Sequence, residues 1–241
     1  MRGVETINRF FLISLPMCLL LALVLPACST PSEELPETVG GDKVVSLPPL
    51  QLTGGTFVEE ALYSRVSRRN FTGEPVSLDK AAQVLWAAQG KGVDGVTGAS
   101  RTAPSAGATH PMEIYLVAGR VEGLKPGVYR YDYLEHSLIL TAAEDLREGL
   151  AAAALNQRFI AEAPASILLA ADYSRTTVRY GERGVRYVHM EVGHITQNIY
   201  LQCESLGLGA VAVGAFADEG VRDVSGIKES PLMIIPFGKA R

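Results

Sequence analysis

Cysteine, tryptophan and histidine are scarce in this sequence of 241 residues, which has three, one and four of them respectively. The three cysteines form no Cys-x-x-Cys pair, so a thioredoxin-like redox motif and a cysteine-rich zinc site are both excluded. No Gly-x-Ser-x-Gly string occurs, which removes the nucleophile elbow of many serine hydrolases. Any chemistry must therefore come from other residue types or from a cofactor.

The first 27 residues are predicted to be an export signal rather than part of the fold. Arg2 and Arg9 give a basic start, and the apolar run FFLISLPMCLLLALVL follows. The string Leu25-Pro26-Ala27-Cys28 resembles a bacterial lipoprotein cleavage box, in which the cysteine is lipidated and becomes the first mature residue. We expect a lipid-anchored protein on the periplasmic side of the cell envelope. An ordinary signal peptide and a single anchor helix are the alternatives, and the choice of membrane stays open.

The predicted mature chain is acidic. Removal of residues 1–27 lowers the basic residues from 22 to 20 and the acidic residues from 26 to 25, a net charge of −5 over 214 residues. An acidic balance argues against nucleic acid as the main partner. A chain of this length can bury one sizeable core, so we expect one domain.

The segment 28–54 is predicted to be a tether, and residues 55–241 the folded domain. The tether is rich in Pro, Glu, Gly and Ser and has few aromatic residues, a composition typical of linkers. Within the domain, Cys203 is the one cysteine left unmodified, and its place in an apolar helical stripe predicts a packed side chain.

Apolar periodicity predicts helices and strands in alternation along the domain. Ser77 and Gly90 are the expected caps of a helix between them. Helices are predicted over 57–66, 78–89, 150–160 and 186–206. Strands are predicted over 112–119, 127–132, 136–142, 165–171, 209–216 and 231–238. This mixture indicates an α+β layered domain.

Two segments have a composition suited to a ligand. Arg65, Ser67, Arg68 and Arg69 lie at the end of the first predicted helix, and guanidinium groups with a hydroxyl can bind phosphate oxygens. The alternative is a solvated, charged surface turn. The loop RTAPSAGATHP (residues 101–111) buries little apolar surface, so it is either a plain connection or a place where backbone meets ligand.

Two further patterns carry less weight. GLGAVAVGA has the glycines of a dinucleotide fingerprint, but a helix precedes it and a strand follows, which is the reverse of the required order. Glu191, His194 and Asn198 form a polar stripe on the long predicted helix. A metal site would need a second such motif, so we favour a stripe satisfied within the fold or at a subunit contact.

The order of motifs resembles the FMN-dependent nitroreductase family, and more narrowly its SagB-type branch, the relatives of thiazoline and oxazoline dehydrogenases. The motifs are Arg-x-Ser-x-Arg-x-Phe, AAQG, RTAPSAGATHP, GHITQN, LGLGAVAVGAF and PLMIIPFG, and they run from about Tyr63 to Arg241. The resemblance implies a three-layer α/β/α fold with a mixed, mostly antiparallel sheet. It also implies a homodimer with one FMN at each subunit interface, and hydride transfer to or from a small organic substrate by a ping-pong cycle.

The resemblance assigns roles to residues in four segments. Arg65, Ser67 and Arg69 match phosphate and ribityl contacts, and Lys239 and Arg241 match a closing phosphate pair, although here the chain stops at Arg241. The loop along the flavin ring edge is matched by Pro104, Ser105, Ala106 and Gly107. The segment whose backbone N–H faces the reactive flavin nitrogen is matched by Gly214 and Ala215.

The sequence departs from the resembled branch at a pair of residues that could take part in catalysis. The peptide-azoline oxidases of this branch carry a Lys-Tyr pair where this chain has Arg179-Tyr180. Lysine can act as a base when desolvated, whereas arginine stays protonated. Tyr180 remains a candidate for orienting substrate or donating a proton, and packing is the alternative for both residues. A second function class is a flavin- or ligand-binding lipoprotein without turnover.

Overall fold

The computed structural model describes residues 44–93 and 100–241, all within one compact unit, Glu37–Arg241. The predicted export signal, Cys28 and the tether up to residue 43 lie outside the described residues. None of the helices in the described ranges has the length and apolar character needed to cross a membrane.

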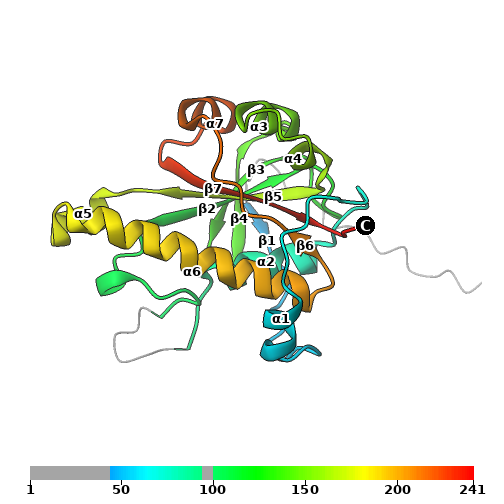
Figure 1. The fold of residues 1–241 in the computed structure, drawn as a ribbon, viewed down its shortest axis with the longest axis horizontal. Coiled ribbons are helices and arrows are strands. Elements are labelled where there is room, and N and C mark those ends of the chain that lie inside the picture. The colour runs from blue at the N-terminus through cyan, green and yellow to red at the C-terminus, as the bar shows by residue number, and fades with distance from the viewer. Residues whose placement is uncertain (1–43, 94–99) are drawn as a thin grey trace, which may run out of the picture. The chain divides into compact units, whose positions relative to one another are not determined.

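A seven-stranded sheet forms the centre of the unit, in the order β1-β4-β3-β2-β5-β7-β6 (Figure 1). The strands are β1 (Val44–Ser46), β2 (Met112–Ala118), β3 (Gly127–Asp132), β4 (Ser137–Ala142), β5 (Ala165–Ala171), β6 (Gly209–Ala210) and β7 (Ser230–Gly238). Every pair of neighbouring strands is antiparallel. Parallel pairing occurs only as isolated bridges in the described ranges, one of which joins Ser67 to Ala210.

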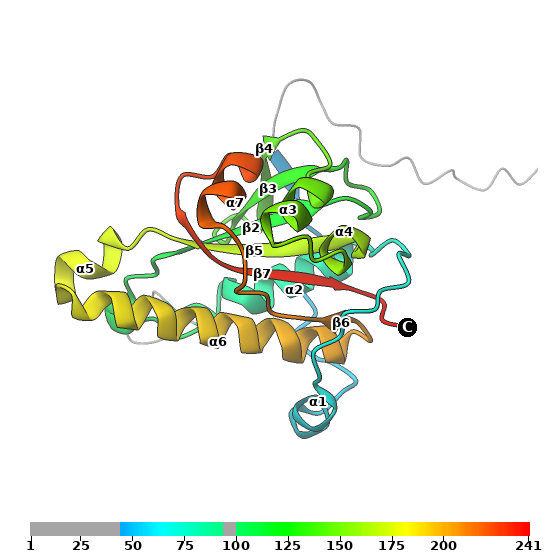
Figure 2. The ribbon, with the colours of Figure 1, turned by 45° about the horizontal axis from the view of Figure 1, so that its top comes forward.

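Helices cover both faces of the sheet (Figure 2). One side carries α2 (Leu78–Gln89) and α6 (Arg183–Ser205), and the other carries α3 (Arg147–Ala153), α4 (Phe159–Glu162) and α7 (Asp218–Ser225). Each side has its own apolar cluster, and β5 contributes Ile167 and Leu169 to the first and Leu168 and Ala170 to the second. The fold is therefore the predicted α+β arrangement in three layers.

The long predicted helix is confirmed and begins slightly earlier than expected. In α6, Val188, Ile195 and Ile199 are completely buried and recur on one face, as the apolar stripe predicts. Cys203 on the same face is buried, and burial raises the pKa of its thiol. The predicted packed role of Cys203 is therefore correct.

The other long periodic segments are also confirmed. Ser77 caps α2 by accepting a hydrogen bond from the N–H of Lys80. Strands β2, β5 and β7 and the hairpin β3–β4 follow the predicted ranges closely. All seven residues of β5 are buried, as expected for an apolar run covered on both faces.

Two predictions for single segments are wrong, and a third segment forms the predicted helix without burying its apolar face. The 150–160 helix is two helices, α3 and α4, because Leu155 and Asn156 between them have φ of 57° and 60°. The 209–216 strand is reduced to the two residues of β6 and an isolated bridge at Val213. The first helix, α1 (Val58–Ser64), buries only the side chain of Ala61.

The folded part begins earlier than residue 55. Val44–Ser46 form β1, which pairs with β4, and His136 Nε2 lies 3.1 Å from the Pro48 carbonyl oxygen. These residues lie in the segment that composition assigns to a tether. Short helices α5 (Ser174–Tyr180) and α7 were also not predicted, because their apolar positions are few.

Candidate functional site

The segment after α1 lies between two other stretches of backbone. The N–H of Arg68 donates to the Ala210 carbonyl oxygen, and the N–H of Arg241 donates to that of Asn70, both at 2.9 Å. Side chains alternate along an extended chain, so Arg65, Ser67 and Arg69 leave one side of the segment. Arg68 leaves the other side and pairs with Glu204 at 3.4 Å.

Tyr200 of α6 organises this region, and the sequence analysis did not single it out. Its hydroxyl lies 3.0 Å from Ser67 Oγ and accepts a hydrogen bond of 2.7 Å from the N–H of Ala212. The guanidinium of Arg65 lies 5.1 Å from the centroid of its ring. A tyrosine inside the buried stripe, at a position where a hydroxyl needs a partner, was the available signal.

The backbone at Gly214 and Ala215 is exposed and follows the segment that Tyr200 holds. Within the described parts of the chain, the N–H groups of these two residues have no hydrogen-bond partner. The carbonyl oxygen of Ala215 is fixed by the Gln157 side chain at 2.9 Å. The structure thus has two backbone donors on the segment that Tyr200 links to Ser67. These cations and hydrogen-bond donors are suited to bind an anion. We therefore use the name anion group for Arg65, Ser67, Arg69, Gly214, Ala215 and Arg241.

Lys239 is less well placed than the resemblance implies. Its ammonium pairs with the exposed carboxylate of Glu74 at 2.9 Å. Its carbonyl oxygen accepts from the N–H of Thr72, so its backbone belongs to the same assembly. Its charge is directed toward Glu74.

The polar stripe of α6 fastens the loop that precedes β2. Asn198 Nδ2 donates to the Thr102 carbonyl oxygen at 3.2 Å, and His194 Nδ1 lies 3.3 Å from that of Pro104. Glu191 accepts a hydrogen bond of 2.8 Å from Gln89 Nε2 and is also hydrogen-bonded to Ser105. All three side chains of the stripe therefore have hydrogen-bond partners within the fold.

Glu191 is the carboxylate of this stripe and is buried, with 2% of its surface exposed. Burial raises the pKa of Glu191 above its ordinary value, although the bonds from Ser105 and Gln89 oppose the shift. Arg101 extends the network, since its Nη1 donates to Gln89 Oε1 at 2.9 Å. A chain of hydrogen bonds thus runs from Arg101 to the loop.

The predicted catalytic pair contacts this loop. Arg179 Nη1 donates to the Gly107 carbonyl oxygen at 3.2 Å, and Tyr180 packs edge-on against Tyr187. Gly107 has φ of 59°, and a Cβ there would lie 2.4 Å from the Tyr180 hydroxyl oxygen. A glycine is required at this point. We call Pro104, Ser105, Ala106, Gly107, Arg179 and Tyr180 the loop group.

The two groups lie on opposite faces of α6 within one chain. Successive helical residues turn by about 100°, so Tyr200 lies about 180° from Glu191 around the axis. The ends also differ, because α5 lies at one end of α6 and α1 and β6 at the other (Figure 1). One chain alone therefore does not gather all the predicted site residues.

Comparisons with known proteins agree with this fold. The family model described as "Nitroreductase family" matches residues 62–239. A Methanocaldococcus jannaschii protein, provisionally named a nitroreductase, is 47% identical over 182 residues, covering 76% of this chain and 90% of the relative. A Ralstonia eutropha JMP134 crystal structure, also provisionally named a nitroreductase, superposes with a TM-score of 0.71 at 29% identity. The superposition covers 83% of this chain and 90% of the Ralstonia chain.

A further relative is the trifolitoxin-processing protein TfxB of Rhizobium leguminosarum bv. trifolii. It is 32% identical over 113 residues, which is 45% of this chain and 30% of the relative.

The fold is α+β, and the family match supports an oxidoreductase. The chain belongs to the nitroreductase family.

Proposed function

We propose that this protein is an FMN-dependent oxidoreductase that transfers hydride to or from a small organic substrate. The observation that carries the proposal is the Tyr200 hydroxyl, which ties the Arg65–Ser67 segment to the backbone leading to Gly214. A site with guanidinium groups, a hydroxyl and unpaired backbone N–H groups fits a phosphate-bearing planar cofactor. The flavin would supply the hydride chemistry in a ping-pong cycle.

The chain's own residues would bind and orient the cofactor. Arg65, Arg69 and Arg241 would hold the phosphate, with Ser67 as a hydroxyl contact, and the N–H of Gly214 or Ala215 would donate to the ring. Positive charge and N–H donors near the ring would favour its reduced, anionic form. Lys239 would contribute only after leaving Glu74.

We further propose that two copies of the chain form each site. The loop group of one copy would meet the anion group of the other, which explains why α6 separates them within one chain. Small residues at Pro104, Ser105, Ala106 and Gly107 would let the loop backbone approach the ring. A homodimer with two identical sites follows from this arrangement.

The SagB-type branch is the more specific proposal, and the likeness to the trifolitoxin-processing protein supports it. Arg179 stays protonated, so it would hold the loop through Gly107 and not accept a proton. The Tyr180 hydroxyl lies close to Gly107 and would orient the substrate or donate a proton. The absence of a lysine base at Arg179 also favours the second candidate, a flavin-binding protein without turnover.

We also propose that Cys28 carries a lipid that anchors the domain to the periplasmic side of the envelope. The support is the sequence Leu25-Pro26-Ala27-Cys28 alone. Replacement of Cys28 by serine is expected to move the protein from the membrane fraction to the soluble fraction. Equal partition of the variant and the unchanged protein would contradict the anchor.

The phosphate assignment is tested by comparing FMN with riboflavin, which lacks the phosphate. The unchanged protein should bind FMN at least about tenfold more tightly, because a hydrogen bond to a charged group contributes about 1.5–3 kcal/mol. Arg69→Gln should remove most of that preference. Arg158→Gln, an exposed residue paired with Glu148, is the matched control and should retain it. Equal binding of FMN and riboflavin by the unchanged protein would overturn the assignment.

A further inference from the structure

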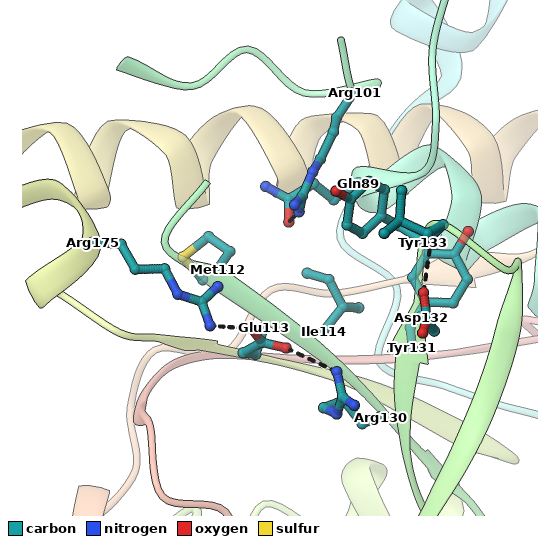
Figure 3. Close-up of a pocket in the computed structure, with 11 residues that line it drawn as sticks. Gln89, Arg101, Met112, Glu113, Ile114, Arg130, Tyr131, Asp132, Tyr133 and Arg175 are labelled. Atoms are coloured by element: carbon teal, nitrogen blue, oxygen red, sulfur yellow. Dashed lines mark hydrogen bonds and ion pairs between the residues drawn. The ribbon is translucent and has the colours of Figure 1, made fainter. Parts of the chain in front are cut away.

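A pocket of about 210 Å³ is lined by Gln89, Arg101 and Met112, among other residues (Figure 3). The end of α2, the start of β2, the end of β3 and helix α5 enclose it. The roles assigned above use Gln89 and Arg101 of its lining but not the cavity itself.

The charged side chains of the pocket leave an excess of positive charge. Three guanidinium groups line it, from Arg101, Arg130 and Arg175, against the carboxylates of Glu113 and Asp132. Asp132 is directed to the hairpin turn, where its Oδ1 accepts from the N–H groups of Leu134 and Glu135.

Glu113 is the partner of only one of the three arginines at close range. Arg175 Nη2 lies 2.6 Å from Glu113 Oε1, and Arg175 also binds the His110 carbonyl oxygen and pairs with Asp172. Arg130 reaches Glu113 only at 3.7 Å. Arg175 thus has three polar partners, while this long ion pair is the one that Arg130 makes within the described residues.

Arg101 is held in a fixed orientation above the pocket. Its guanidinium stacks on the Tyr133 ring with 3.6 Å to the centroid, and its Nη1 is fixed by Gln89. Stacking uses the face of the guanidinium and leaves N–H donors on its edge. In Figure 3, Arg101 enters from above and Arg130 from below, with Ile114 and Met112 between them.

We propose that this pocket binds a small organic oxyanion. Its carboxylate or phosphate oxygens would accept hydrogen bonds from Arg101 and Arg130, and its apolar part would pack against Met112 and Ile114. Two separate guanidinium groups facing one space favour a group with several acceptor oxygens. The ordering cost is small because Arg101 is already oriented. The proposal does not depend on flavin binding.

The test titrates the full-length protein with benzoate and, separately, with inorganic phosphate, at constant ionic strength. Methionine methyl groups carry ¹³C, and the resonance of Met112 is identified with Met112→Leu. We expect a saturable shift of the Met112 methyl, while Met190 and Met233, which do not line the pocket, stay unchanged. Saturation by benzoate alone assigns a carboxylate ligand, and saturation by phosphate alone assigns a phosphate ligand.

Variants separate the pocket from general attraction of anions. Arg130→Gln should weaken binding at least tenfold, and its unliganded Met112 resonance reports whether the fold is kept. Arg101→Gln should weaken binding as well, but it also disturbs Gln89. Arg158→Gln removes the same charge elsewhere, and Arg69→Gln removes it from the anion group, so both should bind as the unchanged protein does.

Three results would overturn the proposal. One is the absence of a saturable Met112 shift with either probe. Another is equal weakening by Arg158→Gln and Arg130→Gln, which would indicate general electrostatic attraction. The third is loss of phosphate binding in Arg69→Gln with retention in Arg130→Gln, which would place the anion at the other group.

Discussion

At the scale of single residues, Glu191 links the buried interior to the loop. Its pKa is raised in the folded protein, so its protonated form is favoured there relative to the unfolded chain. The stability associated with that proton is complete below the unfolded pKa of about 4.3 and is lost as the pH rises through the folded pKa.

Glu191→Gln should therefore change the pH dependence of unfolding. The variant keeps an acceptor for Gln89 and has no ionisable group, so its stability relative to the unchanged protein should improve as the pH rises above about 4. Denaturant unfolding at a series of pH values measures the difference. A difference that stays constant with pH, or that falls as the pH rises, would contradict the buried carboxylate as the cause.

Gly107 gives a second prediction at this scale. Gly107→Ala should be destabilising because φ is 59° and the new Cβ would meet the Tyr180 hydroxyl and the Arg179 guanidinium. Gly123→Ala is the control, with φ of 74° and nothing within 4 Å of the new Cβ. Both should lose about 1–2 kcal/mol through backbone strain, and Gly107→Ala more. Equal losses in thermal unfolding would show that the contact with Tyr180 and Arg179 is unimportant.

At the scale of elements, α6 connects every part of the candidate site. Its apolar face packs on the sheet, its polar stripe holds the loop, and Tyr200 holds the anion group. These three roles require one rigid helix, so its packing should dominate the stability of the whole site.

Ile195→Ala should therefore cost about 2–5 kcal/mol, since Ile195 is fully buried and the substitution leaves a cavity. Val185→Ala on the same helix, at a side chain with 40% exposure, should cost about 0.5 kcal/mol or less. Chemical denaturation with a common slope gives both values. Similar losses for the two variants would be inconsistent with the packing described for α6.

Elements with a long apolar period could be predicted from the sequence, and those set by tertiary contacts could not. The apolar periodicities of α2 and α6 and the apolar run of β5 predicted the right type of element and nearly the right end residues. The break after α3 depends on Leu155 and Asn156 in the left-handed region, which composition does not reveal. β1 has only three residues and forms because β4 presents a partner.

The candidate site likewise has parts that could be predicted from the sequence and parts that depend on tertiary contacts. The Arg65–Arg69 segment and the 104–107 loop could be chosen because their residue types suit a ligand. Tyr200 was missed because an aromatic residue in a buried stripe is normally core. The engagement of Lys239 with Glu74 and the placement of Arg101 over Tyr133 depend on segments far apart in the sequence.

At the scale of the whole molecule, the separation of the two groups by α6 predicts complementation between defective chains. One variant would carry Arg65→Gln and Arg69→Gln, and the other Gly107→Tyr, so that each alone has two defective sites per dimer. Random exchange of subunits should give about a quarter of the normal sites, because half the dimers are mixed and each has one intact site. Steady-state turnover of the mixture, compared with each variant alone, measures this. No recovery after subunit exchange would show that each chain builds its own site.

The most direct test of the central claim is the absorbance spectrum of the purified protein with FMN, before and after a reductant and then an acceptor. We expect flavin bands at ~450 nm at one FMN per chain, which bleach on reduction and return when a quinone or nitroarene is added. Bound flavin that bleaches but is not reoxidised by any acceptor would favour the binding protein without turnover. A protein that takes up no FMN under any condition would contradict the claim.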